Sequence, residues 1–323
     1  MFTRIILFGL YLIISPSSYG WGFHAHRLIN RMAVFCLPQE MLPLYKAEID
    51  YLEMHAVDPD KRRYAVAEEA ARHFIDLEFY CRDSKECTLP QKRQDAVALF
   101  SEDSLQANGE VPWHILRMMF RLEKAFTERN RSAILKLSAD LGHYIGDAHV
   151  PLHTTDNHNG QKTGQTGIHG FWEGRIPELC SKEYSYWAGK AEYLSHPEEA
   201  IWEAVWESHR ALDTVFSAER ESMISLAEDE RYGYESRGSS TQLVRSEKWA
   251  RLYAEKMQGM VERRMIQAIQ LTAAIWFTCW VNAGKPDLRF EKKLPDPVQI
   301  QEEEELEKKF QTANSPLGKS HCD

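Results

Sequence analysis

Apolar residues recur at helical spacing along most of the chain. Intervals of three and four place the apolar side chains on one face of a helix, and this holds in five segments: 27–35, 115–126, 132–145, 200–216 and 246–281. No run of alternating apolar and polar residues is long enough to require a sheet. The Gly/Ser/Tyr-rich segment 231–242 is expected to be a loop between two helices. The pattern predicts an all-α fold.

The same pattern predicts the domain boundaries. Pro and Gly residues do not divide the stretch from 21 to about 284 into two parts, so residues 21–286 are predicted to form one domain. After Pro286 the composition changes to an acidic run at 302–307 and a polar end. Residues 287–323 are therefore predicted to be an acidic polar tail outside the core, disordered or present as a solvated helix.

The first residues have the layout of a secretory signal peptide. Arg4 precedes an uncharged apolar run at 5–14, and small residues occupy the positions before Trp21. The run is too short to span a bilayer, and no later segment has eighteen uninterrupted apolar residues. We expect residues 1–20 to be removed. The mature chain would then begin at Trp21, be secreted or periplasmic, and have no transmembrane segment.

Net charge and cysteine placement narrow the choice of partner and metal. A net charge of −9 provides no basic footprint for long duplex nucleic acid. Short or single-stranded substrates are not excluded, because metal ions can bind their phosphates. The six cysteines contain no C-x-x-C pair, which argues against a thiolate zinc site. Cys81 and Cys87 flank a short polar segment, and they could form a disulfide or stay as free thiols.

The placement of the histidines suggests a metal site. His143 and Asp147 are four residues apart, and His169 and Glu173 repeat this spacing, which puts each pair on one face of a helix. A single pair of this kind is usually a surface pair or a buried histidine with satisfied hydrogen bonds. Two pairs, with further His and Asp residues beside Gly and Pro breaks, indicate a metal site, since buried His and Asp are costly unless paired or metal-bound. Imidazole and carboxylate ligands without thiolate suit catalytic zinc.

These residues occur within an ordered set of motifs. The set resembles the secreted trinuclear zinc nucleases, the single-strand-specific nuclease and 3′-nucleotidase family, whose superfamily also contains the zinc-dependent phospholipases C. The resemblance rests on four segments: WGFHAH (21–26), HFID (73–76), HYIGDAHVPLH (143–153) and HGFWE (169–173). It implies a single multi-helix domain of the phospholipase C and zinc nuclease type.

The resemblance also implies three zinc ions and their ligands. The first ion would be held by Asp58, His73, His143 and Asp147. The second would be held by His153, His169 and Glu173. The third would be held by the amino nitrogen and carbonyl oxygen of Trp21 with His26 and Asp147. Asp147 would thus bridge two ions, and Asp58 would orient or deprotonate the attacking water. Phe74 would stack on a base in a nuclease, with an ordinary core position as its alternative.

The function that the resemblance implies is a zinc-dependent phosphodiesterase. The spacing from Trp21 to His26, and Trp172 before the last ligand, resemble the nucleases and favour single-stranded nucleic acid or nucleotides as substrate. Glu173 stands where those nucleases usually have Asp, and a Glu at this position resembles the phospholipases C. A phospholipid is therefore the alternative substrate. A non-enzymatic, zinc-stabilised binding module is a second alternative, disfavoured by the open water position that three ligands leave on the second zinc. No stable protein partner is inferred.

Overall fold

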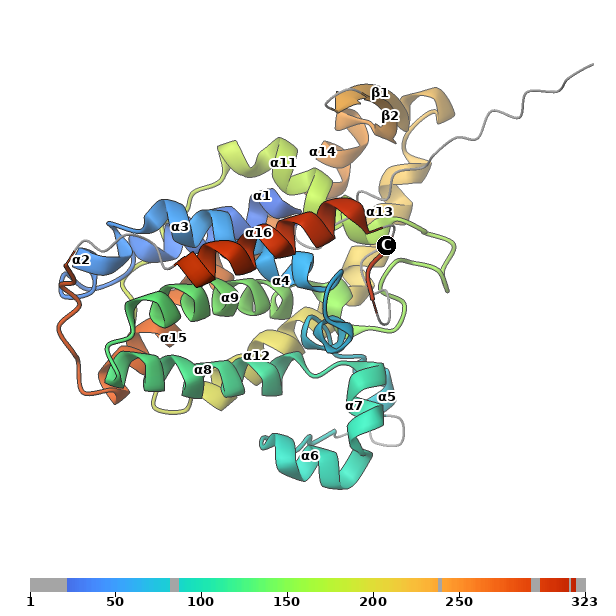
Figure 1. Cartoon of the computed structure of the whole chain (residues 1–323). Coiled ribbons are helices and arrows are strands. Elements are labelled where there is room, and N and C mark those ends of the chain that lie inside the picture. Colours follow the sequence, from blue (N-terminus) through green and yellow to red (C-terminus); the bar gives the residue numbers. More distant parts are fainter. Residues whose placement is uncertain (1–21, 82–86, 238–239, 292–296, 314, 318–323) are drawn as a thin grey trace, which may run out of the picture.

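The computed structural model describes residues 22–81, 87–237, 240–291, 297–313 and 315–317. Over these residues the chain is a multi-helix domain, and the predicted all-α class is confirmed (Figure 1). One small antiparallel hairpin, β1 (Tyr232–Arg237) with β2 (Ser240–Arg245), takes the place of the loop expected at 231–242. Tyr, Thr, Leu and Val in these strands favour extended backbone. None of the described helices is both long and apolar enough to cross a membrane.

The helices and helical turns follow one another with short connections. The α-helices are α1 (Phe23–Val34), α2 (Leu42–Tyr45), α3 (Ile49–Met54), α4 (Asp58–Arg62), α5 (Leu77–Tyr80), α6 (Arg93–Phe100), α7 (Glu102–Asn108), α8 (Val111–Thr127), α9 (Arg131–Ala148), α10 (Ile168–Gly170), α11 (Ile176–Cys180), α12 (Pro197–Arg210), α13 (Leu212–Ile224), α14 (Glu247–Lys256), α15 (Met260–Asn282) and α16 (Pro297–Thr312). Short 3₁₀ turns are η1 (His55–Val57), η2 (Ala67–Arg72), η3 (Pro151–Thr154), η5 (Ser181–Glu183) and η6 (Glu228–Glu230), and η4 (Phe171–Arg175) is a π-helical turn.

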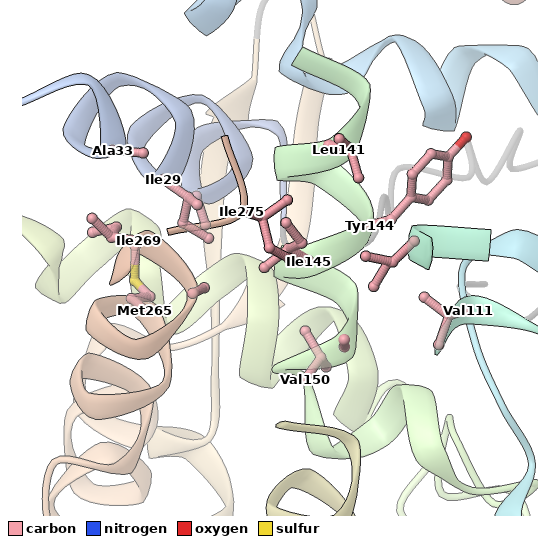
Figure 2. Packing of buried hydrophobic residues seen from close by; sticks show 14 of the residues in the cluster. Ile29, Ala33, Val111, Leu141, Tyr144, Ile145, Val150, Met265, Ile269 and Ile275 are labelled. Atoms are coloured by element: carbon pink, nitrogen blue, oxygen red, sulfur yellow. The ribbon is translucent and has the colours of Figure 1, made fainter. Parts of the chain in front are cut away.

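Helix α9 lies at the centre of the domain. Asn130 caps its first turn by accepting a hydrogen bond from the backbone N–H of Ala133 at 3.1 Å, and Pro151 prevents its continuation. It packs on α1, α3, α8 and α15, and Ile145 meets apolar side chains of α1 and α15 (Figure 2). Residues 137–148 are all buried. Polar side chains on such a helix need partners, because water cannot reach them.

The long amphipathic segment 246–281 is two helices. Between α14 and α15 the backbone turns through Gln258 (φ 51°) and Gly259 (φ 73°), both in the left-handed region that ends a helix. The apolar spacing resumes after the turn, so the pattern alone did not reveal the break.

Cys81 and Cys87 form a disulfide. The sequence left open whether these two cysteines are bonded or free, and the structure shows them bonded. Cys36, Cys180 and Cys279 are buried free thiols.

Part of the acidic tail is a docked helix. Residues 297–312 form α16, which packs on α4 (Figure 1). Glu307 lies 3.0 Å from Nζ of Lys61, and the ring of Phe310 meets that of Tyr64 edge to face at 5.2 Å. These contacts give α16 a surface to pack on, which the acidic composition did not indicate. Of the two states expected for the tail, a solvated helix and a disordered extension, these residues therefore take the helical one.

Candidate metal centre

Buried His and carboxylate side chains gather at one place inside the domain. They form three groups, and within each group the potential ligand atoms lie within 4.8 Å of one another. The first group is His26, Asp60 and His143, the second is His153, His169 and Glu173, and the third is His73, His143 and Asp147. None of these side chains is more than 1% exposed. Every histidine predicted as a ligand belongs to one of these three groups.

Two glycines on α9 bring α1 close to the site. A Cβ atom at Gly142 would lie 1.7 Å from Oδ1 of Asn30, and one at Gly146 would lie 3.0 Å from Nδ1 of His26. The close approach stacks the ring of His26 on that of His143, with centroids 3.8 Å apart. Glycines one turn apart on α9 thus allow a histidine from the first helix to reach the centre.

Asp147 lies between the groups and faces them with both carboxylate oxygens. Its Oδ2 is 3.0 Å from Nδ1 of His73 and 3.3 Å from Nε2 of His143. Its Oδ1 is 3.4 Å from Nε2 of His26 and 3.8 Å from Nε2 of His153. Burial alone would raise the pKa of Asp147, but His143 and His153 outweigh it and hold the pKa well below its usual range. Asp147 therefore lies where a carboxylate shared between two metal ions would lie.

Backbone carbonyls fix two of the imidazole rings. Nδ1 of His143 donates to the carbonyl of Ala56 at 2.9 Å, and Nδ1 of His153 donates to the carbonyl of His73 at 2.7 Å. With Nδ1 protonated, Nε2 of each ring is left as the metal-binding atom, and it points into the centre.

The second group combines three short elements: η3 carries His153, α10 carries His169, and the π-helical turn η4 carries Glu173. Oε2 of Glu173 is 3.1 Å from Nε2 of His169 and 3.2 Å from Nε2 of His153. Burial opposes the charged carboxylate, but the two histidines outweigh it and lower the pKa of Glu173 to about 2. These three residues are the ones that the resemblance assigned to the second zinc.

Asp60, which was not predicted as a ligand, belongs to the first group. Its Oδ1 lies 3.8 Å from Nδ1 of His73 and 3.7 Å from Nε2 of His143. Neither carboxylate oxygen has a hydrogen-bond partner among the described residues. Such a buried carboxylate is costly unless a cation compensates it.

Asp58 lies outside all three groups, which corrects its predicted role. Its Oδ2 is 2.6 Å from Nδ1 of His55, and its Oδ1 is 3.3 Å from Nζ of Lys61. Asp58 and Asp60 are two residues apart on α4, so their side chains leave the helix in nearly opposite directions. Asp58 faces outward, and Asp60 faces the histidines.

The residues present fit zinc. Hydrogen-bond partners are missing, within the described parts of the chain, for both ring nitrogens of His26, both oxygens of Asp60, Oδ1 of Asp147 and Oε1 of Glu173. Leaving such buried atoms without partners costs about 1–3 kcal/mol each, more when charged, and bound cations would supply the partners. The donor atoms belong to imidazole and carboxylate side chains, and the three groups contain no cysteine. This set of donors is typical of catalytic zinc.

Trp21, the predicted ligand through its amino group, lies outside the described residues. The first described residue, Gly22, abuts the turn that carries Glu173: a Cβ atom on Gly22 would lie 3.1 Å from Cα of Gly174. The chain therefore enters α1 beside the second group, and His26 follows one turn later.

A free amine at Trp21 is the first testable requirement. An additional Met before Trp21 should lower bound zinc from about three ions to about two and remove most activity, while the helical circular dichroism spectrum stays unchanged. N-terminal sequencing of exported protein should begin at Trp21. Full zinc content and activity in the Met-extended protein would show that the amine is not a ligand.

The side chain of Phe74 is enclosed by protein in this structure. Its side chain is fully buried, and its carbonyl accepts a hydrogen bond from the backbone N–H of Val111 at 3.1 Å. Gly109 leaves space for the ring, since a Cβ atom there would lie 2.6 Å from Cδ2 of Phe74. In this structure Phe74 thus occupies the buried position that was the alternative to the base-stacking role, and that role stays a prediction.

Burial of Phe74 changes what its removal should do. We expect Phe74→Ala to lower the free energy of unfolding by about 3–5 kcal/mol, the usual cost of a buried Phe. At a temperature where the variant is folded, KM for single-stranded DNA should be unchanged. Chemical denaturation and steady-state kinetics measure the two quantities; a large rise in KM with no loss of stability would support the stacking role.

Glu69 is a buried carboxylate behind His73 that the sequence reasoning missed. It receives hydrogen bonds from Tyr144 and Arg72, and its Oε1 lies 3.8 Å from Nε2 of His73. Burial would raise the pKa of Glu69, but Arg62 and His73 outweigh it and hold the pKa well below its usual range. Glu69 thus places negative charge on the Nε2 side of His73, while Nδ1 of that ring faces Oδ2 of Asp147. The four-residue spacing from Glu69 to His73 was a usable signal.

Comparisons with known proteins give little further information. No family model matches the chain, and no curated protein matches it. Among solved structures, the crystal structure of Clostridium perfringens alpha-toxin from an avian strain is similar, with a TM-score of 0.47 and 12% identity, over 84% of this chain and 66% of the toxin chain. This chain thus spans just under two thirds of the toxin's length.

Proposed function

We propose that this chain is a zinc-dependent phosphodiesterase that hydrolyses phosphate ester bonds at a centre for three zinc ions. The observation that carries the proposal is the convergence of three buried His and carboxylate groups on the two oxygens of Asp147. The order of the motifs along the chain, which resembles the zinc nuclease and phospholipase C superfamily, supports the same chemistry.

The roles of the side chains follow from their placement. Bound zinc supplies positive charge that offsets the phosphoryl oxygens and lowers the pKa of water. His73, His143, Asp147 and Asp60 would hold the first ion. Asp60 would also take the role first given to Asp58, because its carboxylate oxygens can accept a proton. Asp147 would be shared between two ions.

The second group favours catalysis over a purely structural site. It offers three protein ligands, His153, His169 and Glu173. Zinc with three protein ligands keeps a fourth position for water or substrate, whereas structural zinc sites are closed by four. A non-enzymatic zinc-stabilised module is therefore the weaker proposal.

We place a phospholipid first among substrates and single-stranded nucleic acid second. Glu173, the feature that resembles the phospholipases C, lies within a ligand group. Phe74, the residue expected to stack on a base in a nuclease, is fully buried in this structure. The nuclease alternative keeps two supports in the sequence, the short spacing from Trp21 to His26 and Trp172 before the last ligand.

We also propose that the mature protein acts outside the cytoplasm. The layout of residues 1–20 is that of a signal peptide. The disulfide between Cys81 and Cys87 is of a kind that persists in oxidising compartments.

A substrate panel on the mature protein tests the proposal. The panel contains bis(p-nitrophenyl) phosphate, phosphatidylcholine vesicles, single-stranded DNA, RNA and a 3′-nucleotide. We expect hydrolysis of the small diester and release of diacylglycerol, both lost after chelation and restored by zinc. DNA cleavage without diacylglycerol release would select the nuclease alternative. Zinc-loaded protein that hydrolyses nothing in the panel would overturn the proposal.

A further inference from the structure

The hairpin β1–β2 is tied by side chains to the segment that carries His169 and Glu173. It lies at the edge of the domain, beside α14 (Figure 1). Glu235 of β1 and Arg245 of β2 both form hydrogen bonds with residues of the segment 166–175. This segment contains α10 and the π-helical turn η4, and therefore two of the three ligands of the second group.

Arg245 holds the backbone on both sides of His169. Its Nη1 donates to the carbonyl of Gly167 at 2.7 Å, and its Nη2 donates to the carbonyl of Thr166 at 2.8 Å. These two carbonyls come just before His169 in the chain. The same guanidinium lies over the ring of Phe171, two residues after His169, at 4.7 Å from the ring centroid. One rigid cation thus contacts the chain before and after this ligand.

Arg175 makes a second link, on the other side of Glu173. It lies in η4, two residues after Glu173, and its side chain is buried. Its Nη1 and Nη2 donate to the two carboxylate oxygens of Glu235, the first at 2.8 Å. Its Nε donates to the carbonyl of Arg245 at 3.2 Å. A bidentate arginine–carboxylate pair has a defined geometry, so Arg175 connects the end of the turn to both strands.

The second group depends on outside contacts more than the other two groups do. The other two include a residue of the long buried helix α9, whereas the second has its ligands on three separate short elements. Gly170 follows His169 directly, and Gly174 follows Glu173 directly. Glycine loses more conformational freedom than other residues when it is ordered. Contacts from the hairpin would offset this cost.

We propose that Arg245 and the Arg175–Glu235 pair are positioning residues of the second metal group, so that the hairpin sets the affinity of this group for its ion. This role rests on the proposed function, because it concerns residues that would hold zinc. Ligands that are already in place bind an ion more tightly, since binding does not have to order them. Both links end on the segment of the second group, so one ion should be affected and the others should not.

Arg245→Gln in the full mature chain tests the first link. We expect one of about three zinc ions to be bound about 10–100-fold more weakly in competition with a chelator. The remaining ions should be held as tightly as in the parent protein. Anomalous scattering at the zinc edge, from crystals of the variant, should show reduced occupancy at the second group. A loss of overall stability alone would weaken all the ions together.

Two further variants separate positioning from a general effect. Glu235→Gln changes a partly exposed side chain, so it should fold even if Arg245→Gln does not, and it should weaken the same ion to a smaller extent. Arg251→Gln is the control, because Arg251 is an exposed arginine of α14 that pairs with Glu183 and Glu247. It should leave zinc binding unchanged. Equal weakening of all ions, or no weakening in either hairpin variant, would overturn the positioning role.

Hydrogen exchange of the amides at 168–175 in zinc-free protein is a readout that needs neither metal nor activity. Exchange should be faster in Arg245→Gln than in Arg251→Gln. If the parent protein binds no zinc, the proposed metal centre fails instead. Faster exchange would then still support the hold of the hairpin on this segment, and unchanged exchange would reject it.

Discussion

Asp147→Asn should reduce bound zinc from about three ions to about one and lower kcat/KM by about a thousandfold or more. Loss of a residue that only orients a ligand already costs about 10–100-fold, and Asp147 contacts the imidazoles of two groups. Its Oδ2 is 3.0 Å from His73, and its Oδ1 is 3.4 Å from His26. The amide keeps the size of the side chain but loses the negative charge and one acceptor oxygen. Elemental analysis and diester kinetics measure the two effects.

Asp140→Asn is the matched control for Asp147→Asn. Asp140 lies on the same helix and is also buried, but it pairs with Arg62 at 3.0 Å and is in none of the three groups. Its replacement should lower the melting temperature and leave about three zinc ions bound. Equal zinc loss in the two variants would show that any buried charge change on α9 disturbs the centre, and the bridging role of Asp147 would be unsupported.

The second large effect is expected for Asp60→Asn but not for Asp58→Asn. Asp60→Asn should remove about one zinc ion and reduce kcat/KM by about a hundredfold or more, since Asp60 lies among His73 and His143 with no hydrogen-bond donor from the described residues. Asp58→Asn should retain its zinc and keep kcat/KM within about twofold of the parent, because partly exposed ion pairs contribute about 0–1 kcal/mol. Both variants make the same chemical change two residues apart.

These two variants also show which carboxylate holds the first ion: Asp58, as predicted from the sequence, or Asp60, as the structure indicates. If Asp58→Asn loses zinc and Asp60→Asn does not, the first ion is held from the outer side of α4. The geometry around His73 and His143 would then need another explanation. Zinc content, measured with both proteins folded by circular dichroism, makes the comparison independent of the substrate.

The parts of the site that follow from helical spacing were predictable. His143 and Asp147 are one turn apart, and any helix that buries one of them buries the other. His169 and Glu173 follow the same rule, although their turn is partly π-helical. The all-α class was predictable for the same reason, because apolar periodicity depends on local geometry alone.

The choice between Asp58 and Asp60 could not be made from spacing. Both lie in the first turn of α4, and only the direction from which α9 approaches selects the inner one. Phe74 is a similar case, since the residue after a ligand faces either the centre or the core according to packing that is distant in sequence. Gly109 opposite its ring is an example of such packing.

The docking of α16 depended on long-range contacts as well. Its composition indicates solvation, but Lys61 and Tyr64, more than two hundred residues earlier in the chain, provide a charged and aromatic surface for it. Glu69 shows the opposite situation. Its four-residue spacing to His73 is local, so the sequence alone can indicate a carboxylate beside that histidine.

The zinc content of the mature protein tests the central claim most directly. Elemental analysis after extensive dialysis, with protein concentration from amino-acid analysis, gives the number of ions per chain. We expect about three zinc ions, with diester hydrolysis lost on chelation and regained as zinc is returned. Full activity with no zinc, or with a single tightly bound ion, would contradict the account.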